Sequence, residues 1–202
     1  PSPDYPLWTA STVLNGGKAV YYPCDEGQGF MPDPEAVEAL VTPSTRALVI
    51  INPNNPTGAV YSPECLTRLA EIAEANDLVV LSDEIYDQMV YEDAEFVPMA
   101  TLCPNALCAT FSGLSKVYRA CGYRVGWVAF SGALDRSEDF LRAMDLLAAL
   151  RLCSNVPGQW AVQTALGGFQ SIRNLCSKGG RLLESREAVL NGVERSDYLT
   201  LV

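Results

Sequence analysis

Two short apolar runs, residues 47–51 and 78–81, end abruptly in polar residues, and this pattern constrains the fold more than any other. The first run stops at a segment rich in Asn, Pro and Gly, residues 52–58, and the second stops at Ser82 and Asp83. Runs of this length and composition, bounded by turn residues, predict buried strands. Polar residues that follow such strands lie where open α/β sheets bind their ligands.

Helical patterns alternate with these strands. Residues 62–76 begin with Ser followed by Pro, which is typical of a helix start, and Leu66, Leu69 and Ile72 then recur at helical spacing. Asp33 followed by Pro predicts a second helix start. This alternation predicts an α/β fold with a mostly parallel sheet flanked by helices on both faces. The other predicted strands are residues 19–22, 106–111 and 125–130, and the other predicted helices are residues 33–40, 159–172 and 181–190.

Lys116 lies among small residues in the segment 112–126, and it is the residue that most directly indicates chemistry. A desolvated lysine loses its proton easily, and its neutral amine forms Schiff bases with aldehydes. Eight positions later, Arg124 offers a guanidinium fork suited to a phosphate. An aldehyde-reactive amine beside a phosphate ligand suggests pyridoxal phosphate. A solvent-exposed loop lysine is the simpler alternative, because charged side chains usually stay exposed.

Two further polar residues follow the predicted strands. Asn55 lies in the loop after the first strand and could donate to a ligand, although the segment could equally be a simple strand-to-helix turn. Asp83 lies at the carboxyl end of the second strand, where a carboxylate can pair with a protonated pyridine nitrogen. Tyr86, three residues later, could reach the same ring. The alternative for Asp83 is that it caps a following helix.

Together these segments closely resemble the class I aminotransferases, which are pyridoxal-phosphate enzymes of fold type I. The resembling motifs are Asn-Asn-Pro-Thr-Gly at 54–58, Asp-Glu-Ile-Tyr at 83–86, and Ser-Lys at 115–116 followed by Gly-Tyr-Arg-Val-Gly at 122–126. Their order and spacing match the family as well as their residue types. Segments 121–124 and 151–157 resemble the alanine (glutamate–pyruvate) branch most closely. The resemblance covers roughly residues 1–190.

The resemblance implies a role for each matching residue. Lys116 matches the lysine that forms a Schiff base with the cofactor and then moves the proton. Asp83 matches the acid paired with the pyridine nitrogen, and Asn55 and Tyr86 match the two donors to the phenolic oxygen of the ring. Residues 3–8 form a fourth segment that resembles the family, and within it Tyr5 matches the aromatic residue that stacks on the ring, as offset π packing favours.

Two residues match the phosphate site of the family. Arg124 matches the phosphate-binding arginine, and Ser115 is expected to assist it. Many relatives carry serine three places before the lysine, whereas this chain has Gly113. The hydroxyl contact that those relatives make is therefore not expected from this position.

The resemblance also implies a domain organisation. Residues 1–150 match the central part of the cofactor-binding large domain, and residues 151–202 match a helical segment that leads toward a small domain. The glycine-rich phosphate loop and the arginine that binds the substrate carboxylate have no match here, so we expect an incomplete fold from a longer protein. The apolar stripe 146–150 is interpreted as a core or interface stripe. The family implies a homodimer.

The expected function is an aminotransferase that moves an amino group between an amino acid and a 2-oxo acid by a ping-pong mechanism. The resemblance favours alanine with 2-oxoglutarate, or glutamate with pyruvate in reverse. Three alternatives stay open: a pyridoxal-phosphate lyase of the same fold, a catalytically incomplete fragment, and a regulator domain derived from aminotransferases.

Composition argues against several other kinds of catalytic mechanism, metal site and binding partner. The 202 residues contain no histidine, which removes Ser-His-Asp and Cys-His mechanisms and histidine-containing metal sites, and we predict no metal. The formal net charge of −10 argues against nucleic acid or an anionic membrane as a partner. No signal peptide or membrane span is predicted. The seven cysteines lack a Cys-x-x-Cys pair and are expected to be reduced thiols in a cytoplasmic protein.

Overall fold

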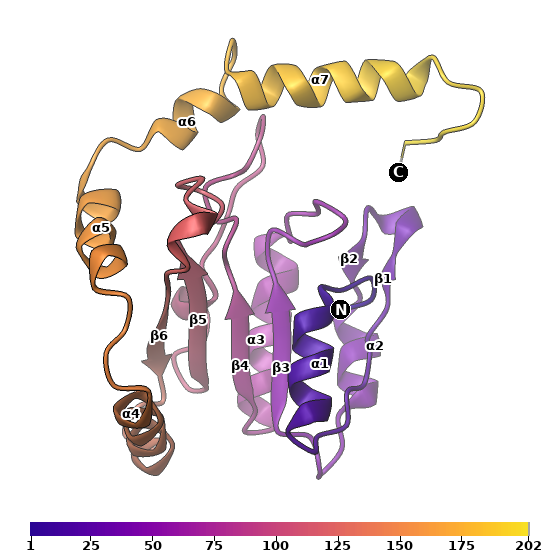
Figure 1. The fold of residues 1–202 in the computed structure, drawn as a ribbon. Helices are drawn as coiled ribbons and strands as arrows, with labels where there is room; N and C mark the ends of the chain where they lie inside the picture. The colour runs from indigo at the N-terminus through magenta and orange to yellow at the C-terminus, as the bar shows by residue number, and fades with distance from the viewer. Residues whose placement is uncertain (202) are drawn as a thin grey trace.

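A four-stranded sheet forms the centre of the molecule, which a computed structural model describes for residues 1–201. The strand order is β3-β4-β5-β6, with β3, β4 and β5 parallel and β6 antiparallel to β5 (Figure 1). The predicted mostly parallel sheet is therefore confirmed. The strands comprise β3 (Ala47–Ile51), β4 (Val79–Asp83), β5 (Leu107–Gly113) and β6 (Gly126–Gly132).

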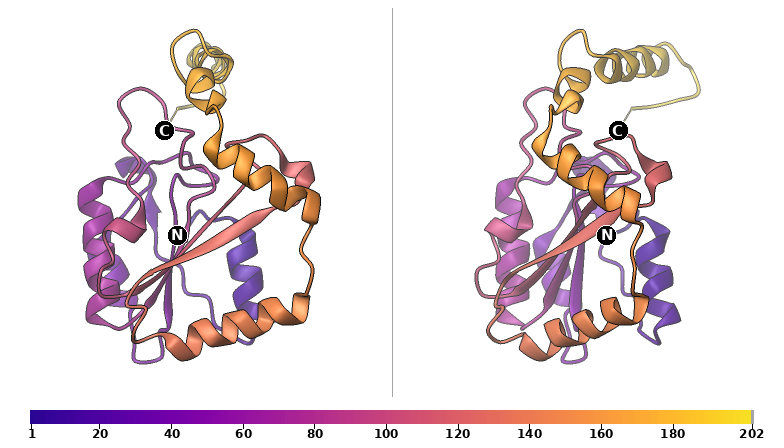
Figure 2. Two further views of the ribbon diagram at one scale, coloured as in Figure 1. Left: turned by 90° about the vertical axis from the view of Figure 1, so that its left-hand side faces the viewer. Right: turned by 60° about the vertical axis from the view of Figure 1, so that its left-hand side comes forward.

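Helices cover both faces of this sheet, as predicted. Figure 2 shows α1 (Pro6–Leu14) on one face and α2 (Pro34–Leu40) with α3 (Pro63–Ala75) on the other. The face under α2 and α3 holds the main core. There Leu66 and Leu69 of α3 lie in one apolar cluster with Ile50 of β3 and Val80 of β4.

The two helix starts that were predicted from sequence are confirmed. The Asp33 carboxylate accepts a hydrogen bond from the Glu35 backbone N–H at 3.0 Å, and the Ser62 hydroxyl accepts one from the Cys65 N–H at 3.2 Å. These bonds satisfy N–H groups that have no partner within the helix.

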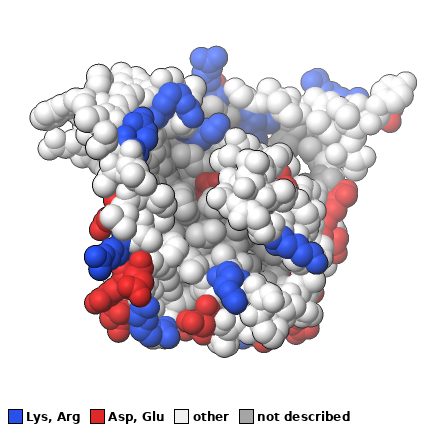
Figure 3. Space-filling model, turned by 60° about the horizontal axis from the view of Figure 1, so that its bottom comes forward, with Lys and Arg blue, Asp and Glu red and all other residues white. Residues whose placement is uncertain are grey.

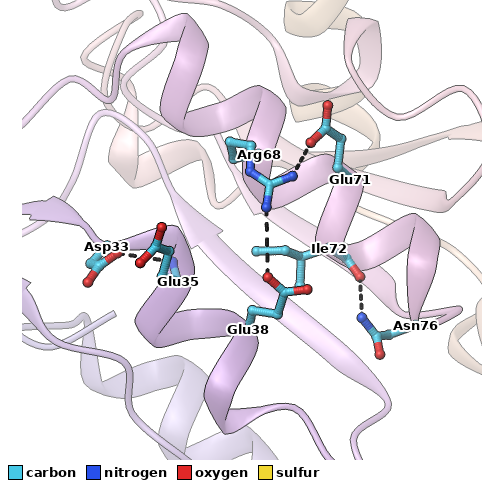
Figure 4. Close-up of polar contacts among 7 residues, drawn as sticks. All are labelled: Asp33, Glu35, Glu38, Arg68, Glu71, Ile72 and Asn76. Carbon is cyan, nitrogen blue, oxygen red and sulfur yellow. Dashed lines mark hydrogen bonds and ion pairs between the residues drawn. The ribbon is translucent and has the colours of Figure 1, made fainter.

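On the solvent side, Arg68 of α3 contacts Glu38 of α2 and Glu71 of its own helix (Figure 4). Asn76 closes α3 by donating its side-chain amide to the Ile72 carbonyl at 2.8 Å. Exposed ion pairs of this kind contribute little, so apolar burial is what holds α2 and α3 together.

One predicted strand is wrong. Residues 19–22 form no strand; the next residue, Pro23, forms an isolated bridge with Ser2, and the small sheet of β1 (Cys24–Asp25) and β2 (Met31–Pro32) follows. The segment is fixed instead by a side chain, since the Tyr22 hydroxyl donates to the Val49 carbonyl at 2.7 Å. Short 3-10 turns complete this part of the structure: η1 (Glu26–Gln28), η2 (Met99–Thr101) and η3 (Cys121–Tyr123).

The C-terminal third is helical, as predicted, but its segmentation differs. The single helix expected at 159–172 is two helices, α5 (Val156–Gly167) and α6 (Ser171–Cys176), because the chain turns at Gly168. There the Gln170 side chain donates to the Ala165 carbonyl at 2.8 Å and holds the turn. The remaining helices are α4 (Glu138–Arg151) and α7 (Arg181–Glu194).

These helices lie around the sheet rather than within its core. In Figure 1, α6 and α7 cross above the carboxyl ends of β3, β4 and β5, whereas α4 lies near the opposite edge. The stripe at 146–150 on α4 is not a core stripe here, because Leu146 and Leu150 are 60% and 81% exposed. The face in Figure 3 carries both basic and acidic side chains. No helix within residues 1–201 is both long and apolar enough to cross a membrane.

Replacing a core leucine should test this packing. Leu69 is fully buried, so Leu69→Ala should lower the free energy of unfolding by about 2–5 kcal/mol through lost contacts and a cavity. Leu147 on α4 is 59% exposed and serves as the control, with a change of about 0.5 kcal/mol or less expected for Leu147→Ala. Urea unfolding followed by circular dichroism measures both, and equal losses would contradict the assigned core.

Candidate active site

Parallel pairing brings the predicted site residues to one edge of the sheet. Ile51 pairs with Asp83 and Asp83 pairs with Phe111, so β3, β4 and β5 end side by side. β6 returns from this same edge, since Gly126 pairs with Gly113. The sequence-predicted residues all lie at or next to this edge: Tyr5, Asn55, Asp83, Tyr86, Ser115, Lys116 and Arg124.

The loop after β3 is held by a buried polar network. The Asn54 side chain accepts a hydrogen bond from the Thr57 hydroxyl at 2.9 Å and donates to the Tyr61 hydroxyl at 3.1 Å. The Asn52 side chain accepts from the Tyr61 backbone N–H at 2.9 Å. Burial raises the pKa of Tyr61, so its phenol stays neutral and acts only as a hydrogen-bonding group. This network leaves Asn55, the next residue, half-buried at the surface of the loop.

Asn55 and Tyr86 line the same cavity, which has a volume of about 640 Å³. One wall is the loop after β3 and another is the segment 86–94 after β4. Arg186 of α7 closes a third side, where its guanidinium is 2.9 Å from a Glu92 carboxylate oxygen and 5.5 Å from the centre of the Tyr91 ring. The cavity thus joins two predicted site residues with an element distant in sequence.

Asp83 is the last residue of β4, and both of its carboxylate oxygens have donors. Oδ2 accepts from the indole N–H of Trp8 at 3.0 Å, and Oδ1 accepts from the Ile85 backbone N–H at 3.3 Å. No helix follows Asp83, because residues 85–88 form turns. The alternative that Asp83 is a helix cap is therefore wrong.

Lys116 and Tyr86 face one another across the loops. The Lys116 Nζ lies 5.7 Å from the centre of the Tyr86 ring, within the range of a cation–π contact. The Lys116 side chain is nevertheless exposed, so the desolvation expected from its small neighbours is not seen. In the connection 114–125, Leu114 and Val117 are the side chains that turn inward and are buried, while Lys116 between them is exposed. Ser115 beside it is half-buried.

Arg124 closes the same connection. It adopts a left-handed conformation with φ 52° and ψ 47°, and its Nη1 donates to the Cys121 carbonyl at 2.7 Å. The side chain is exposed. The Asn155 side chain donates to the neighbouring Tyr123 carbonyl at 2.7 Å, which ties the start of α5 to this turn.

The structure gives a reason for Gly113, the position that departs from the family pattern. A Cβ atom there would lie 2.8 Å from the Val125 carbonyl oxygen and 3.0 Å from the Gly126 Cα. The β5 and β6 backbones approach too closely at this point for a side chain. A serine at this position would therefore not fit unless the two backbones moved apart.

Two residues at this edge were missed from sequence. Trp8 contacts Asp83; it belongs to the family-like segment 3–8, but no signal in the sequence indicates this contact. Glu84 is buried behind Asp83, where its Oε1 accepts from the Ser82 hydroxyl at 2.9 Å and the Met99 N–H at 3.0 Å. Asp83 and Glu84 are adjacent acids, and the sequence gives no signal that Glu84 is the one whose carboxylate is buried.

The family profile described as Aminotransferase class I and II matches residues 1–200. The chain belongs to this family. It is 55% identical over 187 residues to a Mycobacterium tuberculosis protein named alanine aminotransferase, in a match that covers 93% of this chain and 44% of that protein. It is 52% identical to the Escherichia coli glutamate-pyruvate aminotransferase AlaA, over 92% of this chain and 46% of that protein.

The fold comparison agrees with the sequence comparison. The crystal structure of an aminotransferase from Escherichia coli matches 98% of this aminotransferase-family chain with a TM-score of 0.94 and 49% identity. The match covers 49% of the crystallised chain. The chain therefore spans about half the length of the relatives that it matches.

The close approach at Gly113 should make it intolerant of a side chain. Gly113→Ala should lower the free energy of unfolding by about 1–3 kcal/mol, because β5 and β6 must separate to admit a methyl group. Gly122 lies in the same connection, and no atom lies within 4 Å of the place that a methyl group would take there, so Gly122→Ala should be close to neutral. Thermal unfolding of the two variants compares them, and a neutral Gly113→Ala would refute the assigned strand contact.

Glu84 should give the fold a pH dependence. Burial raises its pKa above the ordinary value of 4.5, although hydrogen bonds from Met99 and Ser82 oppose the shift. The folded state therefore holds the proton more tightly than the unfolded chain. Protonated Glu84 therefore stabilises the folded state. This contribution to the free energy of unfolding is fully present below pH 4.5 and is lost as the pH rises through the folded-state pKa of Glu84.

Glu84→Gln keeps the Oε1 acceptor and removes the titrating group. The free energy of unfolding of the variant should therefore change less with pH than that of the unaltered protein. Urea midpoints measured from about pH 4 to about pH 8 in both proteins test the expectation. If the urea midpoint of the variant changed with pH as much as that of the unaltered protein, other groups would be responsible for the pH dependence.

Proposed function

We propose that this protein acts as a pyridoxal-phosphate-dependent aminotransferase, which moves an amino group between an amino acid and a 2-oxo acid in a ping-pong cycle. The observation that carries the proposal is the convergence of Lys116, Tyr86, Asp83 and Asn55 on one edge of the sheet. The chain itself spans about half of its relatives, so the proposal concerns the whole protein.

The side chains at this edge fit pyridoxal phosphate chemically. They offer an amine, a carboxylate, a phenol and an amide, and Arg124 adds a guanidinium on the adjoining connection. The carboxylate suits the cofactor nitrogen, because Trp8 and Ile85 use only two of its lone-pair directions. When bound, the cofactor supplies an aldehyde carbon and a ring that accepts electrons from the substrate α-carbon.

The proposed roles divide into proton transfer and orientation. Lys116 would hold the cofactor covalently through Nζ, and the same Nζ would later take the substrate α-proton and return it. Asp83 would keep a proton on the ring nitrogen. Asn55 and Tyr86 would donate to the phenolic oxygen, and Tyr5, exposed at the start of α1, would stack on the ring. Arg124 and Ser115 would bind the cofactor phosphate.

The names of the relatives support a proposal for the substrate pair. The two bacterial relatives are an alanine aminotransferase and a glutamate-pyruvate aminotransferase, which supports alanine with 2-oxoglutarate as the leading pair. Residues 1–150 would form the central part of the cofactor-binding large domain, and residues 151–202 would lead toward a small domain. We further propose a cytoplasmic homodimer, with the seven cysteines free as thiols in a reducing compartment.

Labelling of the lysines tests the cofactor site. The chain has three lysines, Lys18, Lys116 and Lys178, and all are exposed. Borohydride reduction in the presence of pyridoxal phosphate, followed by peptide mass mapping, should modify Lys116 selectively, and Lys116→Ala should lose the adduct while Lys18→Ala keeps it. Since exposure alone would label all three alike, equal labelling would reject a specific site.

The same protein then tests the reaction. Alanine should abolish the absorbance of the bound aldehyde form and release pyruvate, and 2-oxoglutarate should restore the absorbance. Pyruvate formed together with free ammonia would identify a lyase instead. Selective labelling of Lys116 without any turnover would identify an incomplete catalytic unit.

A further inference from the structure

Helix α1 meets the sheet through one aromatic side chain. None of its nine residues is fully buried, and Trp8 is half-buried at the edge where β4 and β5 end. The indole N–H donates to Asp83 Oδ2 at 3.0 Å, and the indole ring packs edge-on against Phe111, with centroids 5.2 Å apart and planes at 80°. Because Asp83 and Phe111 are paired neighbours on adjacent strands, Trp8 bridges the ends of both.

The same helix carries the predicted stacking residue. Tyr5 is the N-cap residue of α1, with an extended backbone (φ −88°, ψ 117°), and lies three positions ahead of Trp8. The backbone N–H of Trp8 also donates to the Tyr5 carbonyl at 3.3 Å. The contact that fixes Trp8 against Asp83 therefore also fixes where Tyr5 lies relative to that carboxylate.

We propose that Trp8 is a positioning residue of the cofactor site. It would hold one oxygen of Asp83 so that a remaining lone pair faces the ring nitrogen, and it would keep Tyr5 over the same ring. The inference rests on the proposed function. An indole N–H donates a hydrogen bond and accepts none, so it orients the carboxylate without competing for the proton that Asp83 must hold on the cofactor.

A purely structural role would require only the ring of Trp8. Phenylalanine could keep the edge-on contact with Phe111 and the attachment of α1, but it has no N–H. Histidine is smaller and keeps a ring donor. Comparison of Trp8→Phe with Trp8→His therefore separates the hydrogen bond from the packing, and Trp160→Phe provides a control because Trp160 is 72% exposed on α5.

The hydrogen bond itself is tested without any cofactor. The chain has three tryptophans, so an NMR spectrum of the 15N-labelled protein contains three indole N–H signals. The signal that Trp8→Phe removes should exchange slowly with solvent, and Asp83→Ala should shift that signal while leaving the Trp127 and Trp160 signals in place. A fast-exchanging Trp8 signal that Asp83→Ala does not move would overturn the inference.

The consequence for the cofactor is measured as its dissociation constant. Hydrogen bonds to charged groups are among the stronger ones, so Trp8→Phe should weaken pyridoxal phosphate binding about tenfold or more. Trp8→His should recover most of the loss, and Trp160→Phe should bind like the unaltered protein. Equal loss in Trp8→Phe and Trp8→His, or no loss in either, would refute a role for the N–H.

Failure of the proposed function has a different signature. If the unaltered protein gives no selective adduct at Lys116, the proposed function fails and the cofactor role of Trp8 fails with it. If the adduct forms normally but the Trp8 variants bind the cofactor unchanged, the function stands and the positioning role alone is wrong.

Discussion

The parallel pairing of β3, β4 and β5 is the constraint on which the rest of the structure depends. It places Asp83, the last residue of β4, between the ends of β3 and β5. It also sets the loops that follow these three strands side by side. These loops carry polar groups because strand ends leave backbone donors and acceptors that side chains can share. A register shift by one residue between β3 and β4 would turn Asp83 to the other face and separate it from Trp8.

The candidate site is therefore supported by groups that do not take part in its chemistry. Asn54 and Tyr61 hold the loop that presents Asn55, and Glu84 fixes the chain immediately after Asp83 to η2. Each of these supports is a buried polar group with a partner, which is costly to leave unpaired. Adjacent residues of one motif thus have different tasks. The Asn54 side chain holds the loop from inside, and the Asn55 side chain lies at its surface.

The sequence was sufficient to predict the sheet and the edge at which the candidate residues gather, because apolar runs, turn residues and motif spacing are local signals. It failed where the outcome depended on distant contacts. Residues 19–22 have strand-like composition but no strand partner, and Tyr22 is bonded to Val49 through its side chain. The exposure of Lys116 could not be predicted from its small neighbours, since tertiary packing decides which side chains of the connection 114–125 are buried, and Val117 rather than Lys116 is. The contact between Trp8 and Asp83 was not predicted, because it joins residues 75 positions apart in the sequence.

The absence of histidine from the chain gives the Trp8–Asp83 contact a chemical meaning. A histidine donor beside a carboxylate would gain or lose a proton near neutral pH, and the charge next to the cofactor nitrogen would change with it. An indole donor carries no charge and does not titrate in that range. The Asp83 carboxylate is therefore held by a partner whose charge is constant, and in the proposed site proton movement would depend on Lys116 and the substrate.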